Sequence, residues 1–433
     1  MSTANKEPLV SITPLLKRLW PAHSSAVVSS SEIALAISHI FTNSLSPVQA
    51  GALLTALHFT ARDTHADVIA ACASAMRAAA APMDSKTLRD VVRRKGRKEG
   101  GYRGGLCDIV GTGGDSHSTF NISTTSSILA SPLLLLAKHG NRASTSKSGS
   151  ADLLANTSPR APNLQAVTPD TLAKIYEQTN YAFLFAPVFH PGMKHVAAVR
   201  KELGWRTIFN LLGPLANPVE DTGAMEARIV GVARRDLGPV FADALKMSGA
   251  KKALIICGEE DLDELSCAGK SYCWRLVEKP NPAYRGSVTS GEDADYTTSD
   301  DEAPPRTLVQ REDFTLTPAD FGLPAHPLTE VSPGKEPHEN ATILIRILRN
   351  EVKRDDPILH FVLMNTAALF AVAGICDANS SSMGEGDDGK VITETGPGGL
   401  RWKEGVRRAR WCIESGAALR EWERFVEASN SFA

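Results

Sequence analysis

The stretch CDIVGTGGDSHSTFNIST, residues 107–124, contains the residue types of an anion-binding loop. Gly111, Gly113 and Gly114 would let backbone N–H groups point toward one spot, and a following helix would add partial positive charge there. Hydroxyl and amide side chains downstream would supply further donors. The spacing matches neither the P-loop nor the Rossmann fingerprint. A tight turn closed by an Asx-type hydrogen bond is an equal alternative at this point.

Asp115 lies inside this loop and does not suit a plain phosphate cradle, because its charge repels phosphate. The carboxylate could instead orient backbone N–H groups. It could also accept a hydrogen bond from a sugar hydroxyl or from a metal-bound water. A ligand that carries more than phosphate would account for this residue better.

A second polar cluster, AKHGNRASTSKSGSADLL, begins at Ala137 after the apolar run ILASPLLLLA. It offers the cations Lys138, Arg142 and Lys147, the amide of Asn141, and a series of serine and threonine hydroxyls. A lone basic turn is usually a solvated surface. Two donor-rich loops joined by one apolar segment favour a cradle for a polyanion.

Two further clusters follow. HPGMKHVAAVRKELGWRTIFNLLGPLANP, residues 190–218, begins as a helix whose His190 and Arg200 could face one cleft, although a single histidine is more often a core or surface residue. GEEDLDELS, residues 258–266, places a group of carboxylates directly after an apolar strand. Such a group suits Mg²⁺, a hard cation that proteins hold through one or two carboxylates together with substrate phosphates. A solvated acidic loop would have the same spacing.

The elements that must position these clusters divide the chain into two parts. Residues 12–82 are rich in alanine and leucine at helical spacing, and Ser46 followed by Pro47 marks a helix start. Beyond residue 105, short β-like runs such as CDIV, ARIVGV and KALIICG alternate with helices, among them TPDTLAKIYEQTN with Thr168 as its cap. We therefore expect an α/β protein: a small all-helical N-terminal domain (1–82, joined by helices from about 170–205) and a larger α/β domain (106–433) with a largely parallel central sheet.

Three segments are interpreted as mobile insertions: 84–105, which includes the basic, glycine-rich RRKGRKEGGYRGG, and the acidic, polar stretches 279–311 and 377–399. The net charge of −2 argues against a general attraction to nucleic acid or to an anionic membrane. The seven cysteines form no C-x-x-C pair, which disfavours disulfide and zinc frameworks and favours a reducing compartment. No signal-peptide pattern or membrane-length apolar run is found, so we expect a cytoplasmic protein.

Taken in order, GTGGDSHSTFNIST, KHGNR, SGSAD, the long 190–218 motif and DELS resemble the anthranilate phosphoribosyltransferase family of tryptophan biosynthesis over nearly the whole chain. The resemblance implies a helical domain and an α/β domain with the active site between them. It also implies a homodimer joined through the helical domains. The reaction it implies transfers phosphoribose from phosphoribosyl pyrophosphate to the amine of anthranilate, with Mg²⁺ required and pyrophosphate released.

Site residues follow from the resemblance position by position. Those expected at phosphoribosyl pyrophosphate are Gly111, Gly114, Asp115, Thr119, Asn121, Ser123, Thr124, Lys138, Asn141, Ser146 and Ser150. Those expected along the anthranilate path are Gly111, Asn141, His190, Arg200, Gly213 and Pro214. Ser123, Asp263 and Glu264 would serve magnesium, directly or through water. Lys138 would stabilise charge on the leaving group, and no covalent nucleophile is expected.

Two other functions are compatible with this architecture. A pyrimidine nucleoside phosphorylase handles a ribose phosphate, but KHGNR and the 190–218 signature match the transferase instead. A non-catalytic relative that binds nucleic acid would be expected to show a basic groove and to lack Asn141, His190 and Arg200. The sequence therefore favours the transferase, with small-molecule substrates and neither nucleic acid nor membrane as a partner.

Overall fold

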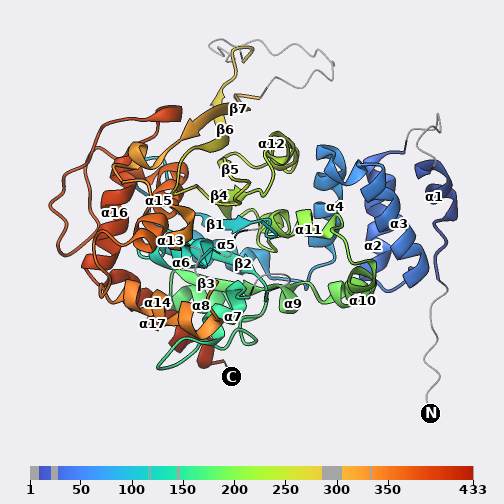
Figure 1. Ribbon diagram of the computed structural model, residues 1–433, viewed down its shortest axis with the longest axis horizontal. Coiled ribbons are helices and arrows are strands. Elements are labelled where there is room, and N and C mark those ends of the chain that lie inside the picture. The colour runs from blue at the N-terminus through green and yellow to red at the C-terminus, as the bar shows by residue number, and fades with distance from the viewer. Residues whose placement is uncertain are drawn as a thin grey trace, which may run out of the picture.

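The structure, a computed structural model, describes residues 9–20, 28–115, 117, 119–143, 147–284, 305–331 and 334–432. A helical part and an α/β part lie side by side (Figure 1). The helical part is built from α1 Thr13–Leu19, α2 Ser30–Phe41, α3 Pro47–Phe59, α4 Ala66–Ala78, α10 Lys194–Leu203 and α11 Phe209–Leu212. Ser46 caps α3 by accepting from the N–H of Gln49, so the helix start expected there is confirmed.

The α/β part contains one seven-stranded sheet in the order β3-β2-β1-β4-β5-β6-β7. Its strands are β1 Leu106–Gly111, β2 Leu135–Gly140, β3 Tyr181–Phe185, β4 Met225–Gly231, β5 Ala253–Gly258, β6 Ser271–Pro280 and β7 Thr307–Leu316. The strands from β3 to β5 pair in parallel, and β6 and β7 add an antiparallel edge. This confirms the expected fold class, a helical domain followed by an α/β domain with a largely parallel sheet.

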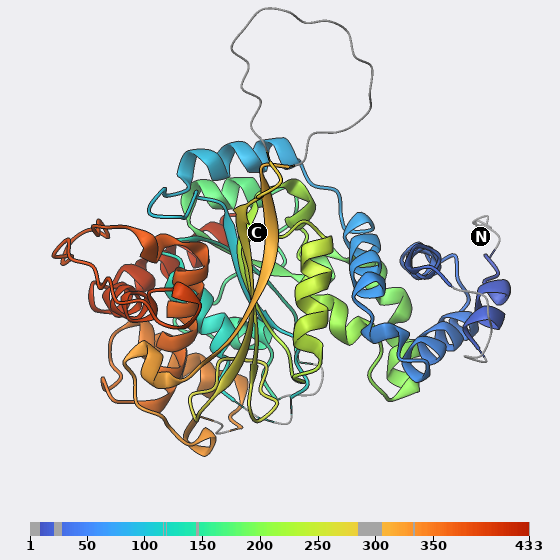
Figure 2. The ribbon, with the colours of Figure 1, turned by 90° about the horizontal axis from the view of Figure 1, so that it is seen from above.

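Helices cover both faces of the sheet, which lies edge-on in Figure 2. α12 fills the space between one face and α4, while α6 and α15 pack on the other face. Successive residues of a strand point to opposite faces, so Ile229 joins the core under α15 and Val230 joins the core shared with α12 and the helical part. The remaining helices are α5 Ser85–Lys95, α6 Ile122–Ala130, α7 Ser150–Ala155, α8 Leu172–Gln178, α9 Ala186–Phe189, α12 Leu237–Met247, α13 Leu328–Val331, α14 Pro337–Leu348, α15 Pro357–Ala373, α16 Trp402–Glu414 and α17 Ala417–Asn430.

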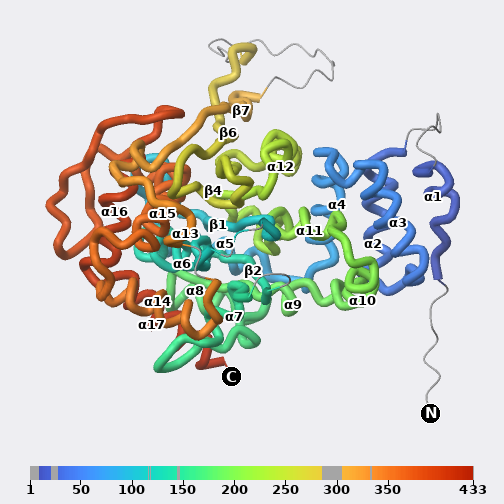
Figure 3. Tube along the Cα trace, in the orientation of Figure 1, coloured from blue at the N-terminus to red at the C-terminus, as the bar shows by residue number. Residues whose placement is uncertain are grey.

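The segment that joins the two parts is shorter than expected. In Figure 3 the α10–α11 segment runs beside the N-terminal helices, although it is far from them in sequence. α10 packs against α2 and α3, and α11 packs against α4. α8, by contrast, packs against α5 and α17 in the α/β part. It begins at Leu172 with Thr171 at its N-cap position, and the Thr168 hydroxyl accepts from the N–H of Thr171 in the turn that precedes the helix.

Two segments interpreted as mobile insertions are packed elements. Residues 84–105 include α5, whose Leu88, Val91 and Val92 are buried. These three apolar residues recur at helical spacing among cationic residues, so the composition of the segment does not reveal its buried face. Residues 377–399 fold over α16, where the Trp411 indole donates to the carbonyl of Glu385 and the N–H of Ile392 donates to Glu404.

The third such segment, 279–311, is in part an extension of the sheet. Its two ends continue β6 and β7 as an antiparallel hairpin, in which Lys279 pairs with Leu308. Residues 285–304 lie outside the described residues. All seven cysteines are buried free thiols. Among the described residues, no helix combines the length and the apolar character that crossing a membrane requires.

Candidate active site

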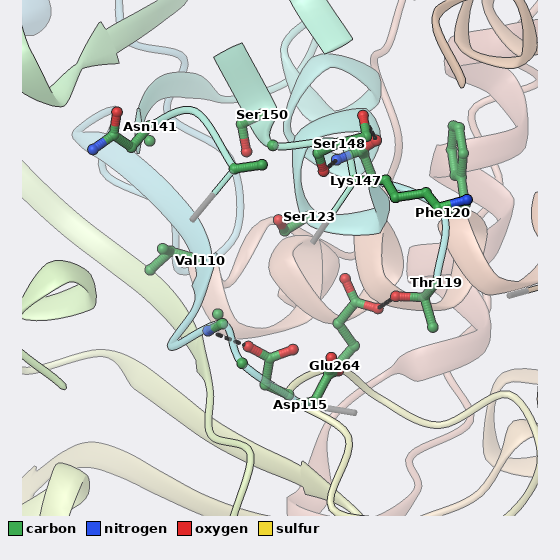
Figure 4. Close-up of a pocket in the computed structure, with 18 of the residues that line it drawn as sticks. Val110, Asp115, Thr119, Phe120, Ser123, Asn141, Lys147, Ser148, Ser150 and Glu264 are labelled. Carbon is green, nitrogen blue, oxygen red and sulfur yellow. Dashed lines mark hydrogen bonds between the residues drawn. The ribbon is translucent and has the colours of Figure 1, made fainter. Parts of the chain in front are cut away.

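A polar cavity of about 290 Å³ lies where β1, β2 and β5 end. Carboxyl ends of parallel strands form the common ligand-binding edge of an open α/β sheet. Most of the residues expected at phosphoribosyl pyrophosphate line this first cavity: Gly111, Gly114, Asp115, Thr119, Asn121, Ser123, Lys138, Asn141 and Ser150. In Figure 4, Asp115 and Glu264 lie on one side of the cavity and Ser148 and Ser150 on the other, with Ser123 between them.

Among the described residues of that expected set, Thr124 is placed differently. Thr124 is fully buried at the start of α6 and does not line the cavity. Its hydroxyl donates to the Ser150 hydroxyl at 2.8 Å, so it holds a lining residue from behind. Ser146 lies outside the described residues.

Asp263 and Glu264 form the acidic side of the first cavity, opposite the serine hydroxyls. Asp263 accepts a 2.6 Å hydrogen bond from the N–H of Gly113, and Glu264 accepts a 3.4 Å hydrogen bond from the hydroxyl of Thr119. Gly111 and Gly231 are paired at the ends of β1 and β4, and a Cβ at either would collide with Asp263. The absence of side chains at these two positions lets the acidic loop lie directly over the strand ends.

Burial and mutual repulsion perturb the acids in this cavity. The pKa of Asp263 is raised to about 7, chiefly because the carboxyl is buried and secondly because the charge of Asp115 is close to it. The pKa of Glu264 is raised well above its usual range, by burial first and then by Asp263 and Asp115. Burial likewise raises the pKa of Asp115. Carboxyls that repel one another in a polar cavity are suited to a cation that would relieve the repulsion.

The oxygen-bearing side chains of the first cavity suit magnesium, which substrate and water help to bind, better than a metal ion bound by protein side chains alone. Among the described residues, no group of three or more His, Cys, Asp or Glu side chains has the spacing to hold a metal ion alone. Mg²⁺ is usually bound through one or two carboxylates, waters and substrate phosphates. Asp263 and Glu264 supply two carboxylates, and the Ser123 hydroxyl lines the same cavity.

Lys138 brings a cation into this site from β2. The side chain is buried, and its Nζ donates to the carbonyl of His139 at 3.2 Å. Burial lowers the pKa of Lys138, and the charges of Asp108, Glu264 and Asp263 oppose that shift. Asp108, also buried, accepts a 2.9 Å hydrogen bond from Asn217 of the 190–218 motif. The carboxylates around Lys138 therefore favour its charged form beside the cavity.

A second cavity, of about 760 Å³, adjoins the first and reaches toward the helical part. It is lined by all the residues expected along the anthranilate path: Gly111, Asn141, His190, Arg200, Gly213 and Pro214. Gly111 and Asn141 line both cavities. The structure therefore brings the two sets of expected residues to one junction at the end of the sheet.

Arg200 enters the second cavity from α10. Its guanidinium donates to Asn210 at 3.4 Å and lies over the Phe209 ring, 5.6 Å from the centroid. Burial lowers the pKa of Arg200, although a guanidinium stays protonated in proteins. His190 is fixed by a 2.8 Å contact between Nε2 and the carbonyl of Ala216, and burial lowers its pKa. A fixed, partly desolvated guanidinium is well placed to bind a carboxylate.

His139 is a residue of this site that the expected set omits. Its ring lies 5.2 Å from that of His190, and the residue lines both cavities. Nε2 of His139 is buried and has no hydrogen-bond partner among the described residues. Burial lowers the pKa of His139 well below its usual range, with His190 and Lys138 adding to the shift. A neutral ring with a free nitrogen could bond a substrate atom.

Other lining residues come from segments that no motif marked. Gly334, Lys335 and Asn340 approach the first cavity from the region around the start of α14, and Asn340 donates to Asn121 at 3.1 Å. These residues lie in the last quarter of the chain. The sequence around them has no glycine-rich or charged motif that would have linked them to the first cavity. Arg142 and Lys147, by contrast, belong to the second polar cluster and line the cavity as that cluster suggests.

Comparison with known proteins places the chain within a family. Residues 103–284 and 289–419 match the model of the glycosyl transferase family a/b domain, and residues 13–80 match its helical bundle domain. An anthranilate phosphoribosyltransferase of Schizosaccharomyces pombe is 37% identical over 395 residues, covering 91% of each chain. One of Saccharomyces cerevisiae is 34% identical over 336 residues, covering 75% of this chain and 73% of the relative.

Solved structures agree with the sequence relatives. The Saccharomyces cerevisiae anthranilate phosphoribosyltransferase in complex with PRPP and Mg has a TM-score of 0.72 at 29% identity and covers 96% of this chain and 97% of its own. The Thermus thermophilus enzyme has a TM-score of 0.68 at 31% identity, with 96% and 99% covered. Fold, motifs and near-complete coverage agree, and the chain belongs to the anthranilate phosphoribosyltransferase family.

Proposed function

We infer that the protein transfers phosphoribose from phosphoribosyl pyrophosphate to the amine of anthranilate and releases pyrophosphate. The observation that carries this inference is the junction of the two cavities, at which Gly111 and Asn141 line both. One cavity offers hydroxyls, cations and acids, and the other offers Arg200 among apolar groups. Solved relatives in complex with PRPP and Mg and with 4-fluoroanthranilate support this assignment.

In this proposal the first cavity holds phosphoribosyl pyrophosphate. Backbone N–H groups of the glycine-rich loop and the hydroxyls of Thr119, Ser123 and Ser150 would donate to phosphate oxygens. Asp115 would accept from a ribose hydroxyl or a metal-bound water. Magnesium, held by Asp263 and Glu264 with Ser123, would neutralise charge on the pyrophosphate.

Lys138 would stabilise the same charge from the protein side. As the bond to pyrophosphate breaks, negative charge grows on the leaving group and positive charge on the ribose. A buried ammonium group interacts with that charge in a low-dielectric site, where the interaction is much stronger than in water. Because the Lys138 side chain is buried and its Nζ donates to the carbonyl of His139, it would need little rearrangement as the reaction proceeds.

In the second cavity, Arg200 would bind the carboxylate of anthranilate with two parallel hydrogen bonds. An aromatic amine is already neutral at pH 7, so the attack requires no strong general base. The residues of the two cavities would then act chiefly by bringing amine and ribose together, which contributes about 7–11 kcal/mol in well-oriented reactions.

The test is the loss of anthranilate fluorescence when purified protein is mixed with phosphoribosyl pyrophosphate, Mg²⁺ and anthranilate. We expect turnover that requires all three additions. Folded protein that leaves the fluorescence unchanged would refute the assignment. Phosphorolysis of a pyrimidine nucleoside in a parallel reaction would point to the nucleoside phosphorylase alternative.

We further propose that the protein is a homodimer joined through its helical part and works in a reducing compartment such as the cytoplasm. Large apolar side chains are exposed in the helical part, among them Leu35 on α2 and Val48 on α3. These side chains would be covered by a partner's helical part in such a dimer. The seven buried free thiols are compatible with a reducing compartment.

A further inference from the structure

Arg206 makes a contact with the glycine-rich loop that the proposed reaction does not use. It lies between α10 and α11 and lines neither cavity. Its Nη1 donates to the carbonyl of Gly114 and its Nη2 to the carbonyl of Gly113, each at 2.8 Å. One guanidinium therefore holds two successive carbonyls of the glycine-rich loop, about ninety residues away in the chain.

Holding these carbonyls also orients the amides that follow them. A trans peptide is planar, and its C=O and N–H point in opposite directions. With the carbonyls of Gly113 and Gly114 drawn toward Arg206, the N–H groups of Gly114 and Asp115 must point away from it. Gly114 and Asp115 both line the first cavity, where backbone N–H groups can bind anions.

The loop has little intrinsic preference for this conformation. Gly113 and Gly114 have φ values of 67° and 78°, which glycine adopts readily but does not enforce. On its other side, the N–H of Gly113 donates to Asp263 at 2.6 Å. The loop backbone is thus bonded from both sides, by Asp263 of the α/β part and by Arg206.

Arg206 belongs to the other structural part. The neighbouring α10 packs on α2 and α3, and α11 packs on α4, so Arg206 is anchored to the helical part. The glycine-rich loop, in contrast, continues β1 of the sheet. The same connecting segment also presents Arg200 to the second cavity.

We propose that Arg206 is a positioning residue for the pyrophosphate site: it orients the amides of the glycine-rich loop for phosphate and ties that loop to the segment that carries Arg200. The inference rests on the proposed function, because the ligand is taken to be phosphoribosyl pyrophosphate. Arg206 lies in the 190–218 motif, whose Arg200 is expected to bind anthranilate. The proposal assigns Arg206 instead to the binding of phosphoribosyl pyrophosphate.

The test compares Arg206→Ala and Arg206→Lys with the wild-type protein. Lysine keeps the charge but cannot supply two parallel donors to two carbonyls. We expect the Kd for magnesium–phosphoribosyl pyrophosphate, measured by calorimetry, to rise about tenfold or more in the Ala variant, and less in the Lys variant. The KM for anthranilate should stay within about twofold. Amide hydrogen exchange should accelerate in peptides covering residues 111–121, with no ligand present.

A matched control is Arg420→Ala, which removes another exposed guanidinium that donates to a backbone carbonyl, that of Ser415. It should change neither the Kd nor the exchange of the loop. A phosphoribosyl pyrophosphate Kd within twofold of wild type in both Arg206 variants would overturn the proposal. So would an equal rise in the constants of both substrates, which would indicate only loosened packing. If the wild-type protein binds no phosphoribosyl pyrophosphate, the proposed function fails, while the exchange measurement still tests the tie to the loop.

Discussion

The carboxylate of Asp263 accepts a 2.6 Å hydrogen bond from the backbone N–H of Gly113, joining two motifs that are 150 residues apart in the chain. The bond brings the acidic loop after β5 against the glycine-rich loop after β1. β4 lies between these two strands, and its terminal Gly231 leaves room for Asp263. Removal of the Asp263 charge should therefore affect the glycine-rich loop as well as the metal.

Asp263→Asn combined with Glu264→Gln should abolish most magnesium-dependent turnover. Losing preorganised charge at a reacting centre costs on the order of 10²–10³-fold in rate. The measurement is initial velocity as a function of Mg²⁺ concentration. Glu259→Gln, in the same loop but with a side chain 54% exposed, is the control and should behave as wild type. A double variant with a normal magnesium response would place the metal elsewhere.

Arg200→Ala should raise the KM for anthranilate far more than that for phosphoribosyl pyrophosphate. Hydrogen bonds to charged groups contribute about 1.5–3 kcal/mol, which corresponds to roughly 10- to 150-fold in affinity. Steady-state kinetics with each substrate varied in turn measures the split. Lys201→Ala changes an exposed residue of the same helix and should leave both constants unchanged. Equal losses for both substrates would contradict the role given to Arg200.

Gly111→Ala should lower the turnover of the enzyme with little effect on the rest of the fold. The added methyl group would collide with the Asp263 carboxylate, so the acidic loop would have to shift away from the first cavity. We expect turnover to fall at least tenfold and the magnesium requirement to rise. In Gly269→Ala the added methyl group meets open space, so this variant should keep wild-type kinetics. Full activity in Gly111→Ala would show that the loop tolerates the shift.

His139→Asn should make the protein less sensitive to acid. Burial lowers the pKa of His139 in the folded state, while the pKa of a histidine in the unfolded chain is about 6.5. Between these values the unfolded chain binds more protons, so stability present above about pH 6.5 is lost as the pH falls. Denaturation midpoints at pH 7 and pH 5 should therefore differ less in the variant. The exposed His65→Asn variant should retain the wild-type difference, and an unchanged difference in His139→Asn would contradict the prediction.

Val48→Glu should convert the proposed dimer to a monomer. Val48 is 81% exposed in the first turn of α3, where an acidic side chain favours the helix, so folding should be preserved. Light scattering after size exclusion measures the mass. Met247→Glu, at a 60% exposed position on α12 outside the helical part, should remain dimeric. Dimers of unchanged stability in Val48→Glu would place the interface on another surface.

The sequence by itself determined the fold class and most of the candidate site. Strand–helix alternation predicted a largely parallel sheet, and the polar clusters predicted which strand ends carry chemistry, because these are local patterns. Local composition also led to two wrong predictions of mobile insertions. In 84–105 the cationic residues concealed the buried stripe of α5, and in 377–399 the polar composition concealed its packing on α16.

Only the tertiary structure decided how the clusters face one another. Asn340 bonds Asn121, Arg206 holds the carbonyls of Gly113 and Gly114, and Thr124 supports Ser150 from behind. Such contacts join residues far apart in the chain, and their partners depend on strand order and helix packing. The sequence therefore predicted which residues could bind the substrates. The folded chain decided which of them meet at one end of the sheet and which hold the others in place.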